Sequence, residues 1–94
     1  MSNPIKGKVV VIPGAGSSLG EATARLLAAQ GAHLVLGAES ITRLESLAGE
    51  LESSGGQVIT MAMDVTRRDQ VQDLVNAAMR TFGRMDVMVS TSQD

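Results

Sequence analysis

Residues 9–28 read VVVIPGAGSSLGEATARLLA. The β-branched run at residues 9–12 is typical of a strand buried on both faces of a parallel sheet. A turn with three glycines follows, and apolar residues at helical spacing begin at Leu19. A helix that starts behind a glycine turn offers unpaired N–H groups and a positive dipole end to a phosphate. The stretch therefore predicts a dinucleotide site, with a plain turn of small residues as the alternative.

The remaining sequence continues the alternation of strand and helix. Short apolar runs predict strands near 33–36, 57–63 and 86–89, and apolar residues at helical spacing predict helices near 41–51 and 66–82. The order βαβαβαβ predicts one α/β domain over residues 1–94. Its sheet should be a truncated, Rossmann-like, doubly wound parallel sheet with strand order 3-2-1-4. In that topology the first two helices cover one face of the sheet and the third covers the other.

The composition narrows the class of protein. Apolar residues make up 44% and charged residues 19% of the sequence, as in ordinary globular proteins. The net charge of -2 and the scattered basic residues argue against nucleic-acid binding. Cysteine is absent and His33 is the only histidine, which argues against a transition-metal site. No apolar run approaches a membrane span, and the N-terminus lacks a signal-peptide core, so we expect a cytoplasmic protein that contacts no membrane.

Four segments resemble the N-terminal half of a classical short-chain dehydrogenase/reductase: KGKVVVIPGAG, EATARLLAAQGAHLVLGA, MDVTRRDQVQDLV and FGRMDVMV. Members of this family carry Thr-Gly-x-x-x-Gly-x-Gly in the first turn. Gly14 and Gly20 match that motif, and Leu19 fills its usual aliphatic position. Pro13 replaces the threonine and Ser18 replaces the middle glycine. The resemblance implies that this turn binds the cofactor.

Ser18 places a Cβ where the family brings its backbone against a phosphate. A left-handed or crowded backbone at this position would cost more with serine than with glycine. The hydroxyl offers two compensations, either as the N-cap of the helix or as a donor to the phosphate. We therefore expect weaker cofactor binding than is usual in the family.

Two positions bear on the choice between NAD and NADP. The resemblance places Ser17 where NADP-preferring relatives often carry Arg or Lys. Glu39 follows Gly20 by nineteen residues, near the spacing of the acid that binds the ribose hydroxyls of NAD. The acid of typical NAD-using relatives aligns with Ala38 instead, so a solvated loop acid is the alternative for Glu39. Together these positions predict NAD as the cofactor.

Asp64 and Val65 match the family's Asp-Val pair after the third strand, where the carboxylate and the neighbouring backbone contact the adenine ring. The location of Asp64 at the C-terminal end of a strand favours this role, because ligands bind there in open α/β sheets. The alternative is a loop acid ahead of a helix cap, since Thr66 and Asp69 fit a capping box.

The catalytic part of the family pattern is not found in this sequence. Residues 90–93 do not match the family's Asn-Asn-Ala-Gly, and the sequence contains no tyrosine for the catalytic Tyr-x-x-x-Lys. The family reaction is hydride transfer between NAD(P) and a carbonyl or alcohol. We therefore expect an NAD(P)-binding module that is inactive alone. The alternatives are one piece of an enzyme completed by another chain, and a structural or interaction domain that binds no nucleotide.

Self-association is a further expectation, with exchange of elements between copies and marginal stability as the alternatives. The helices and the strand that would cover the rest of the family's sheet are not in this sequence. Part of the surface of residues 9–12 and 87–89 should therefore be exposed, and the fourth strand should present an open edge at residues 86–90.

Overall fold

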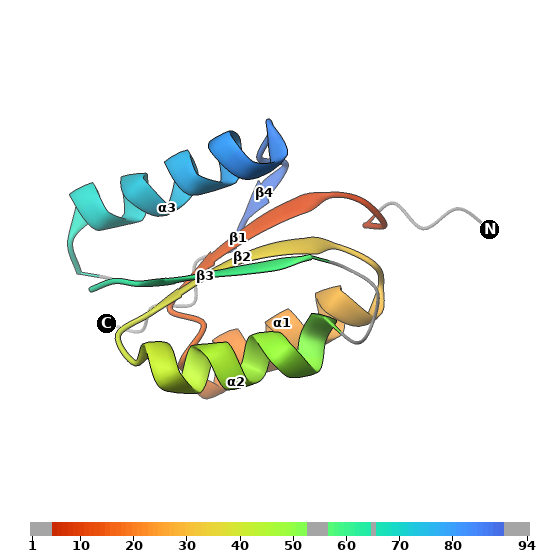
Figure 1. Cartoon of the computed structure of the whole chain (residues 1–94), viewed down its shortest axis with the longest axis horizontal. Coiled ribbons are helices and arrows are strands. Elements are labelled where there is room, and N and C mark those ends of the chain that lie inside the picture. The colour runs from red at the N-terminus through yellow and green to blue at the C-terminus, as the bar shows by residue number, and fades with distance from the viewer. Residues whose placement is uncertain (1–4, 53–56, 65, 90–94) are drawn as a thin grey trace.

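The computed structural model describes residues 5–52, 57–64 and 66–89 (Figure 1). In this part of the chain the elements follow one another as β1 (Val9–Pro13), α1 (Ser18–Ala29), β2 (His33–Ala38), α2 (Ile41–Glu52), β3 (Val58–Ala62), α3 (Arg68–Phe82) and β4 (Val87–Met88). The strands form one parallel sheet in the order β3-β2-β1-β4. The predicted α/β fold and its strand order are confirmed.

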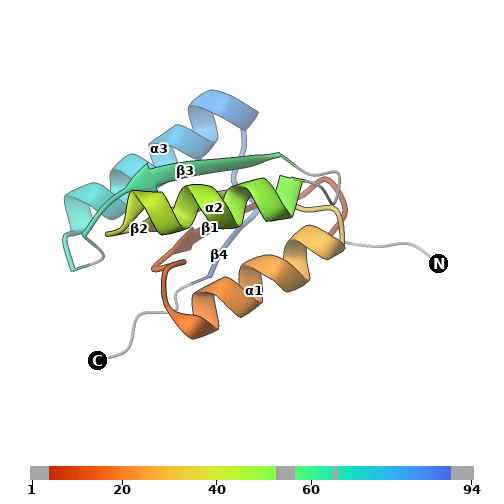
Figure 2. The same cartoon turned by 60° about the horizontal axis from the view of Figure 1, so that its bottom comes forward.

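The sheet separates two layers of helices. Helices α1 and α2 lie side by side on one face, and α3 lies on the other, as predicted (Figures 1 and 2). Because successive side chains of a strand point to opposite faces, each central strand contributes to both layers of the core. The layer under α1 and α2 contains Val10, Ile12, Leu34 and Leu36, and the layer under α3 contains Val9, Val11, Val35 and Leu74.

Helix α1 packs on the sheet through small residues rather than through its leucines. Gly20, Ala24 and Ala28 are buried, whereas Leu19 and Leu26 are 54% and 61% exposed. Helical spacing predicts an apolar stripe from Leu19, Ala22, Leu26 and Leu27, and this prediction is therefore wrong at Leu19 and Leu26. Small side chains let the helix backbone approach the sheet, which keeps the start of α1 close to the end of β1.

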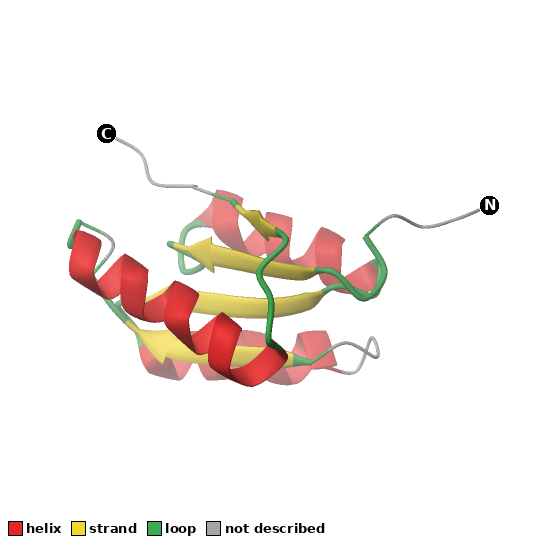
Figure 3. Ribbon diagram, turned by 90° about the horizontal axis from the view of Figure 1, so that it is seen from above, coloured by secondary structure: helices red, strands yellow, loops and turns green. Residues whose placement is uncertain are grey.

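Strand β1 is covered on both faces and flanked on both edges. Its residues 9–12 are at most 1% exposed, because helices lie over both faces and because β2 and β4 pair with it. The predicted exposure of residues 9–12 is therefore wrong. The predicted exposure of the fourth strand is confirmed for Val87 and Met88, which are 41% and 46% exposed. Strand β4 forms an edge of the sheet in the described part of the chain (Figure 3).

Asp86 joins the start of β1 to the start of β4. Its Oδ2 accepts a hydrogen bond of 2.8 Å from the backbone N–H of Val9, and its own N–H donates to the Val9 carbonyl at 2.9 Å. Arg84 forms an ion pair with the Oδ1 of the same carboxylate. The Val9 N–H, and after it the Arg84 guanidinium, lowers the pKa of Asp86 from its ordinary value. The charged form of this carboxylate therefore stabilises the sheet.

Asp86→Asn is expected to make the melting temperature depend less steeply on pH under acidic conditions. A lowered pKa in the folded state means that the stabilisation is complete above the unfolded value, about 3.9, and is lost as the pH falls through the folded value. The wild type should therefore lose melting temperature steeply below about pH 4, and the variant less steeply. Thermal unfolding followed by circular dichroism across this range measures the difference. Glu45→Gln, an exposed change on α2, should keep the wild-type slope, and the same slope in Asp86→Asn would contradict the prediction.

Candidate dinucleotide-binding site

The turn between β1 and α1 is fixed to the neighbouring strand through a single carbonyl. The backbone N–H groups of Gly14 and Ala15 both donate to the carbonyl oxygen of Gly37 in β2, each at 2.9 Å. Gly14 has a φ of 83°, a left-handed conformation that favours glycine. The turn then closes through a hydrogen bond of 3.1 Å from the N–H of Ser17 to the Gly14 carbonyl.

Ser17 is the N-cap of α1. Its hydroxyl accepts a hydrogen bond of 3.0 Å from the N–H of Gly20 and donates to the carbonyl of Gly14, also at 3.0 Å. The N-cap alternative for Ser18 is therefore wrong, because Ser18 is already the first residue of the helix. Its backbone is also not left-handed, since no described residue other than glycine has a positive φ. A penalty for a left-handed serine therefore does not arise at this position.

Three backbone N–H groups remain unpaired at the N-terminus of α1. Those of Gly16, Ser18 and Leu19 donate to no acceptor in the part of the chain that the structure describes. The exposed hydroxyl of Ser18 likewise makes no hydrogen bond there. Unpaired N–H groups at a helix N-terminus are the donors that bind phosphate in dinucleotide-binding proteins. The donor set of this turn therefore fits a pyrophosphate.

Two glycines allow the close packing that shapes the turn. A Cβ on Gly20 would lie 2.9 Å from the Cα of Ala15 and closer still to the carbonyl oxygen of Gly14. A Cβ on Gly16 would lie 3.2 Å from the Cβ of Ala38, at the end of β2. The turn thus rests on its own backbone on one side and on β2 on the other.

The end of β2 presents an acid beside this turn. Ala38 is buried, whereas Glu39 is exposed immediately after the strand. The nearby cation, Arg43, donates to the carboxylate of Glu21 at 3.1 Å. That bond and the one from Arg25, which is the larger cause, lower the pKa of Glu21.

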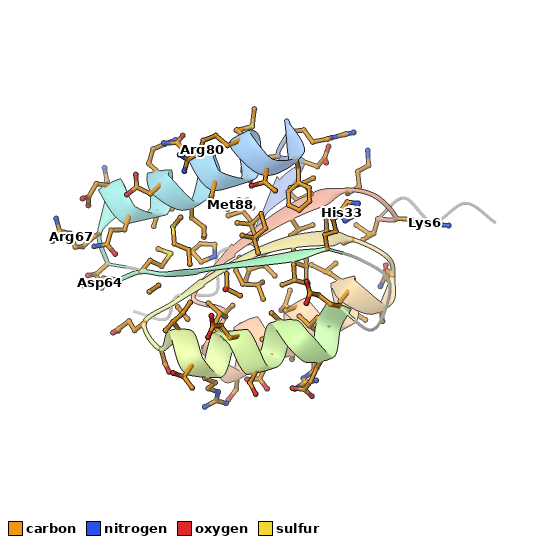
Figure 4. All side chains as sticks on the ribbon, viewed as in Figure 1. Lys6, His33, Asp64, Arg67, Arg80 and Met88 are labelled. Carbon is orange, nitrogen blue, oxygen red and sulfur yellow. The ribbon has the colours of Figure 1, made fainter. Side chains whose placement is uncertain are left out.

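Asp64 follows the end of β3 (Figure 4). Its Oδ1 accepts hydrogen bonds from the hydroxyl of Thr66 at 2.6 Å and from the N–H of Thr66 at 2.9 Å, and these bonds lower the pKa of Asp64. Thr66 is therefore not the cap of α3 as the capping box predicts. The N-cap is Arg67, which makes no capping hydrogen bond with its side chain. Val65 lies outside the described residues.

The candidate residues share one edge of the sheet. The register pairs Pro13 with Gly37, and Gly37 with Met61, so the three parallel strands end at the same edge. The Gly14–Gly20 turn, Glu39 and Asp64 follow these three ends. This is the edge where ligands bind in open α/β sheets.

Sequence reasoning missed two residues that support this edge. Gly37 holds the turn through its carbonyl, and a Cβ on it would lie 2.9 Å from the Cγ of Met63. A glycine inside a strand is a known sign of such close approach, so this signal was available in the sequence. Gln70 accepts a hydrogen bond of 2.6 Å from the N–H of Asp64 through its side chain, and no sequence motif marks it.

The fold and the turn together define a Rossmann-like α/β domain. The sequence model of the short chain dehydrogenase family matches residues 8–92. The chain belongs to the short-chain dehydrogenase/reductase family. It spans about a third of the length of the relatives described next.

An uncharacterized oxidoreductase of Listeria innocua is 43% identical over 84 residues, which are 89% of this chain and 34% of that protein. L-sorbose reductase from Gluconobacter frateurii, solved with NADPH and L-sorbose, has a TM-score of 0.90 and 37% identity. That match covers 100% of this chain and 36% of the reductase. A short-chain dehydrogenase/reductase from Burkholderia phymatum, solved with NAD, has a TM-score of 0.83 and 38% identity over 94% of this chain and 31% of its own.

Among the described residues, none of the helices is long and apolar enough to cross a membrane. The same residues contain no cluster of His, Cys, Asp and Glu side chains that would hold a metal ion.

Proposed function

We propose that this chain binds a nicotinamide dinucleotide, with the pyrophosphate on the Gly14–Gly20 turn. The observation that carries the proposal is the set of unpaired N–H groups on Gly16, Ser18 and Leu19 at the N-terminus of α1. The hydroxyl of Ser18 adds a fourth donor beside them. Related structures that contain NAD or NADPH support the class of ligand.

The other residues that the sequence indicates are part of the same proposal. Glu39 would accept hydrogen bonds from the adenosine ribose, and the free Oδ2 of Asp64 with the backbone of Val65 would contact adenine. Asp64 keeps this capacity because its described hydrogen bonds use Oδ1 alone.

A bound nicotinamide dinucleotide supplies the hydride donor or acceptor of an oxidoreductase. The residues of this chain would bind and orient that cofactor. In members of the family a tyrosine transfers the proton. Because this sequence contains no tyrosine, that step would need a group from outside these 94 residues. The function proposed for the chain is therefore a cofactor-binding module of an oxidoreductase.

Titration of NADH against the chain, followed by fluorescence or calorimetry, tests the proposal. Gly14→Asp is the control, because it places a side chain on a left-handed residue and an acid beside the phosphate site. We expect saturable binding that this variant loses. The absence of a saturable signal with the wild type at millimolar NADH would favour a domain that binds no nucleotide.

We further propose NAD as the preferred cofactor, supported by the exposed acid at Glu39 and by the pairing of Arg43 with Glu21. Glu39→Arg is expected to shift the ratio of the NADPH and NADH dissociation constants toward NADPH by about tenfold, since repulsion of the 2′-phosphate becomes attraction. Calorimetric titrations with both cofactors measure that ratio. Glu45→Arg makes the same charge change on α2 and should leave the ratio unchanged. An unchanged ratio in Glu39→Arg would place that side chain away from the ribose.

We also propose that the chain self-associates through the open edge of β4. The support is the exposure of three apolar side chains on β4 and on the segment before it: Met85, Val87 and Met88. Light scattering coupled to size-exclusion chromatography over a concentration series should show self-association that Met88→Lys weakens. A concentration-independent monomer would refute this contact.

A further inference from the structure

A groove lies at the β3 edge of the sheet, opposite the β4 edge. It is separate from the candidate dinucleotide site. Helix α3 packs over β1 and β2, whereas α2 covers β3 from the other face. The α3 side of β3 is therefore left partly open, with a groove of about 590 Å³ lined by Met61, Asp73, Asn76, Met79 and Arg80. Figure 4 shows Arg80 on α3 at this side of the molecule.

Strand β3 has unpaired backbone groups along its outer edge. Two hydrogen bonds fix its orientation: the N–H of Leu34 donates to the carbonyl of Gln57, and the N–H of Met63 donates to the carbonyl of Ala38, both at 2.9 Å. Because backbone groups alternate along a strand, the odd-numbered residues of β3 face β2. The N–H and C=O groups of residues 58, 60 and 62 therefore face away from the sheet.

The sequence of β3 lacks the residues that usually prevent a further strand from pairing at a sheet edge. It reads VITMA and contains no charged residue and no proline, which are the usual means of preventing a further strand from pairing there. Four of its five residues are half-buried, so the edge is accessible and not covered by another described element.

Charges beside the groove are arranged symmetrically. Asp73 and Arg80 lie two helical turns apart on α3, with Asn76 between them, and both are exposed. Neither makes an ion pair or a side-chain hydrogen bond with any described residue. Neither has an opposite charge three or four residues away along the helix. A two-fold axis beside Asn76 would place Asp73 of one copy opposite Arg80 of the other, twice.

We propose that the β3 edge and its groove bind a second copy of this chain. The two β3 strands pair in antiparallel orientation about an axis that runs perpendicular to the sheet near Thr60. This axis keeps α3 of both copies on one face, joins the two grooves over the Met61 side chains, and sets Asp73 of each copy opposite Arg80 of the other across the joined grooves. Isologous pairing of this kind needs one self-complementary surface, and the described edge provides the backbone, the apolar floor and both charges.

Single charge reversals and their mixture test this geometry. Asp73→Arg and Arg80→Asp each turn both intermolecular pairs into like charges, so each variant alone should dimerise at least about tenfold more weakly than wild type. An equimolar mixture of the two should regain dimers, because every pair in the mixed dimer is again opposite in sign. The double variant should regain them for the same reason. Measurements in the Met88→Lys background separate this contact from the β4 edge.

Light scattering over a concentration series gives the dimer constant, and circular dichroism confirms that each variant is folded. Thr60→Pro provides a second test, because it removes an outward N–H without breaking a bond to β2. Loss of dimers in both single variants with recovery in the mixture supports the proposal. A monomeric Met88→Lys background at millimolar concentration overturns it, and so does a dimer that neither reversal weakens.

Discussion

Gly20→Ala is expected to weaken NADH binding at least about tenfold and to lower the free energy of unfolding by about 1–3 kcal/mol. The added Cβ would meet the carbonyl of Gly14 and the Cα of Ala15, at 2.9 Å from the latter. Both contacts are backbone atoms of the turn, so relief requires the turn itself to move. That movement separates the unpaired N–H groups from the arrangement that fits a pyrophosphate. Calorimetric titration and chemical denaturation measure the two effects.

Gly49→Ala is the matched control for that variant. Gly49 lies within α2, and a Cβ on it meets nothing within 4 Å. The same substitution there should therefore stabilise the chain by roughly 0.5–1 kcal/mol through helix propensity and leave NADH binding unchanged. Equal losses of binding in the two variants would mean that the packing around Gly20 does not determine the site.

Leu74→Ala is expected to lower the free energy of unfolding by about 2–5 kcal/mol. Leu74 is fully buried between α3 and the sheet, in the core layer that also contains Val9, Val11 and Val35. Its truncation leaves a cavity in a layer that one helix alone covers. Urea denaturation gives the loss, and Leu26→Ala, at a position 61% exposed on α1, should change stability by less than about 0.5 kcal/mol. A loss at Leu74 no larger than at Leu26 would show that α3 contributes little to the core.

The architecture was predictable because each strand is a compact apolar run and each helix has apolar residues at helical spacing. The right-handed connection between parallel strands then leaves few topologies, and the strand order 3-2-1-4 is one of them. The turn between β1 and α1 that contains Gly14 was also predictable, since a strand, a glycine turn and a helix in succession form a recognisable pattern.

The finer assignments depended on distances that the sequence does not contain. Ser17 and Ser18 are adjacent and equally suited to cap α1, so only the helix start selects Ser17. Thr66 has the spacing of a capping residue, yet its hydroxyl is taken by the Asp64 carboxylate and α3 begins two residues later. The packing of α1 through alanines was missed because hydrophobicity scales rank leucine above alanine, whereas close approach to a sheet favours the smaller side chain.

The groove beside β3 had no signature in the sequence. It exists because α3 lies over β1 and β2 rather than over β3. The apolar pattern of a helix does not predict which strands that helix will cover. The spacing of Asp73 and Arg80 can be read from the sequence. It indicates an interface only when the structure places both side chains beside an open strand edge.

Gly37 links the core under α3 to the turn between β1 and α1. This one oxygen accepts the N–H groups of both Gly14 and Ala15, and the residue that carries it packs against the side chains of Met63 and Leu74. A change of side-chain volume at Met63 or Leu74 would therefore act on the turn through Gly37, without any contact with a ligand. The packing of Met63 and Leu74 against Gly37 should therefore influence the geometry of the turn at a distance from its unpaired N–H groups.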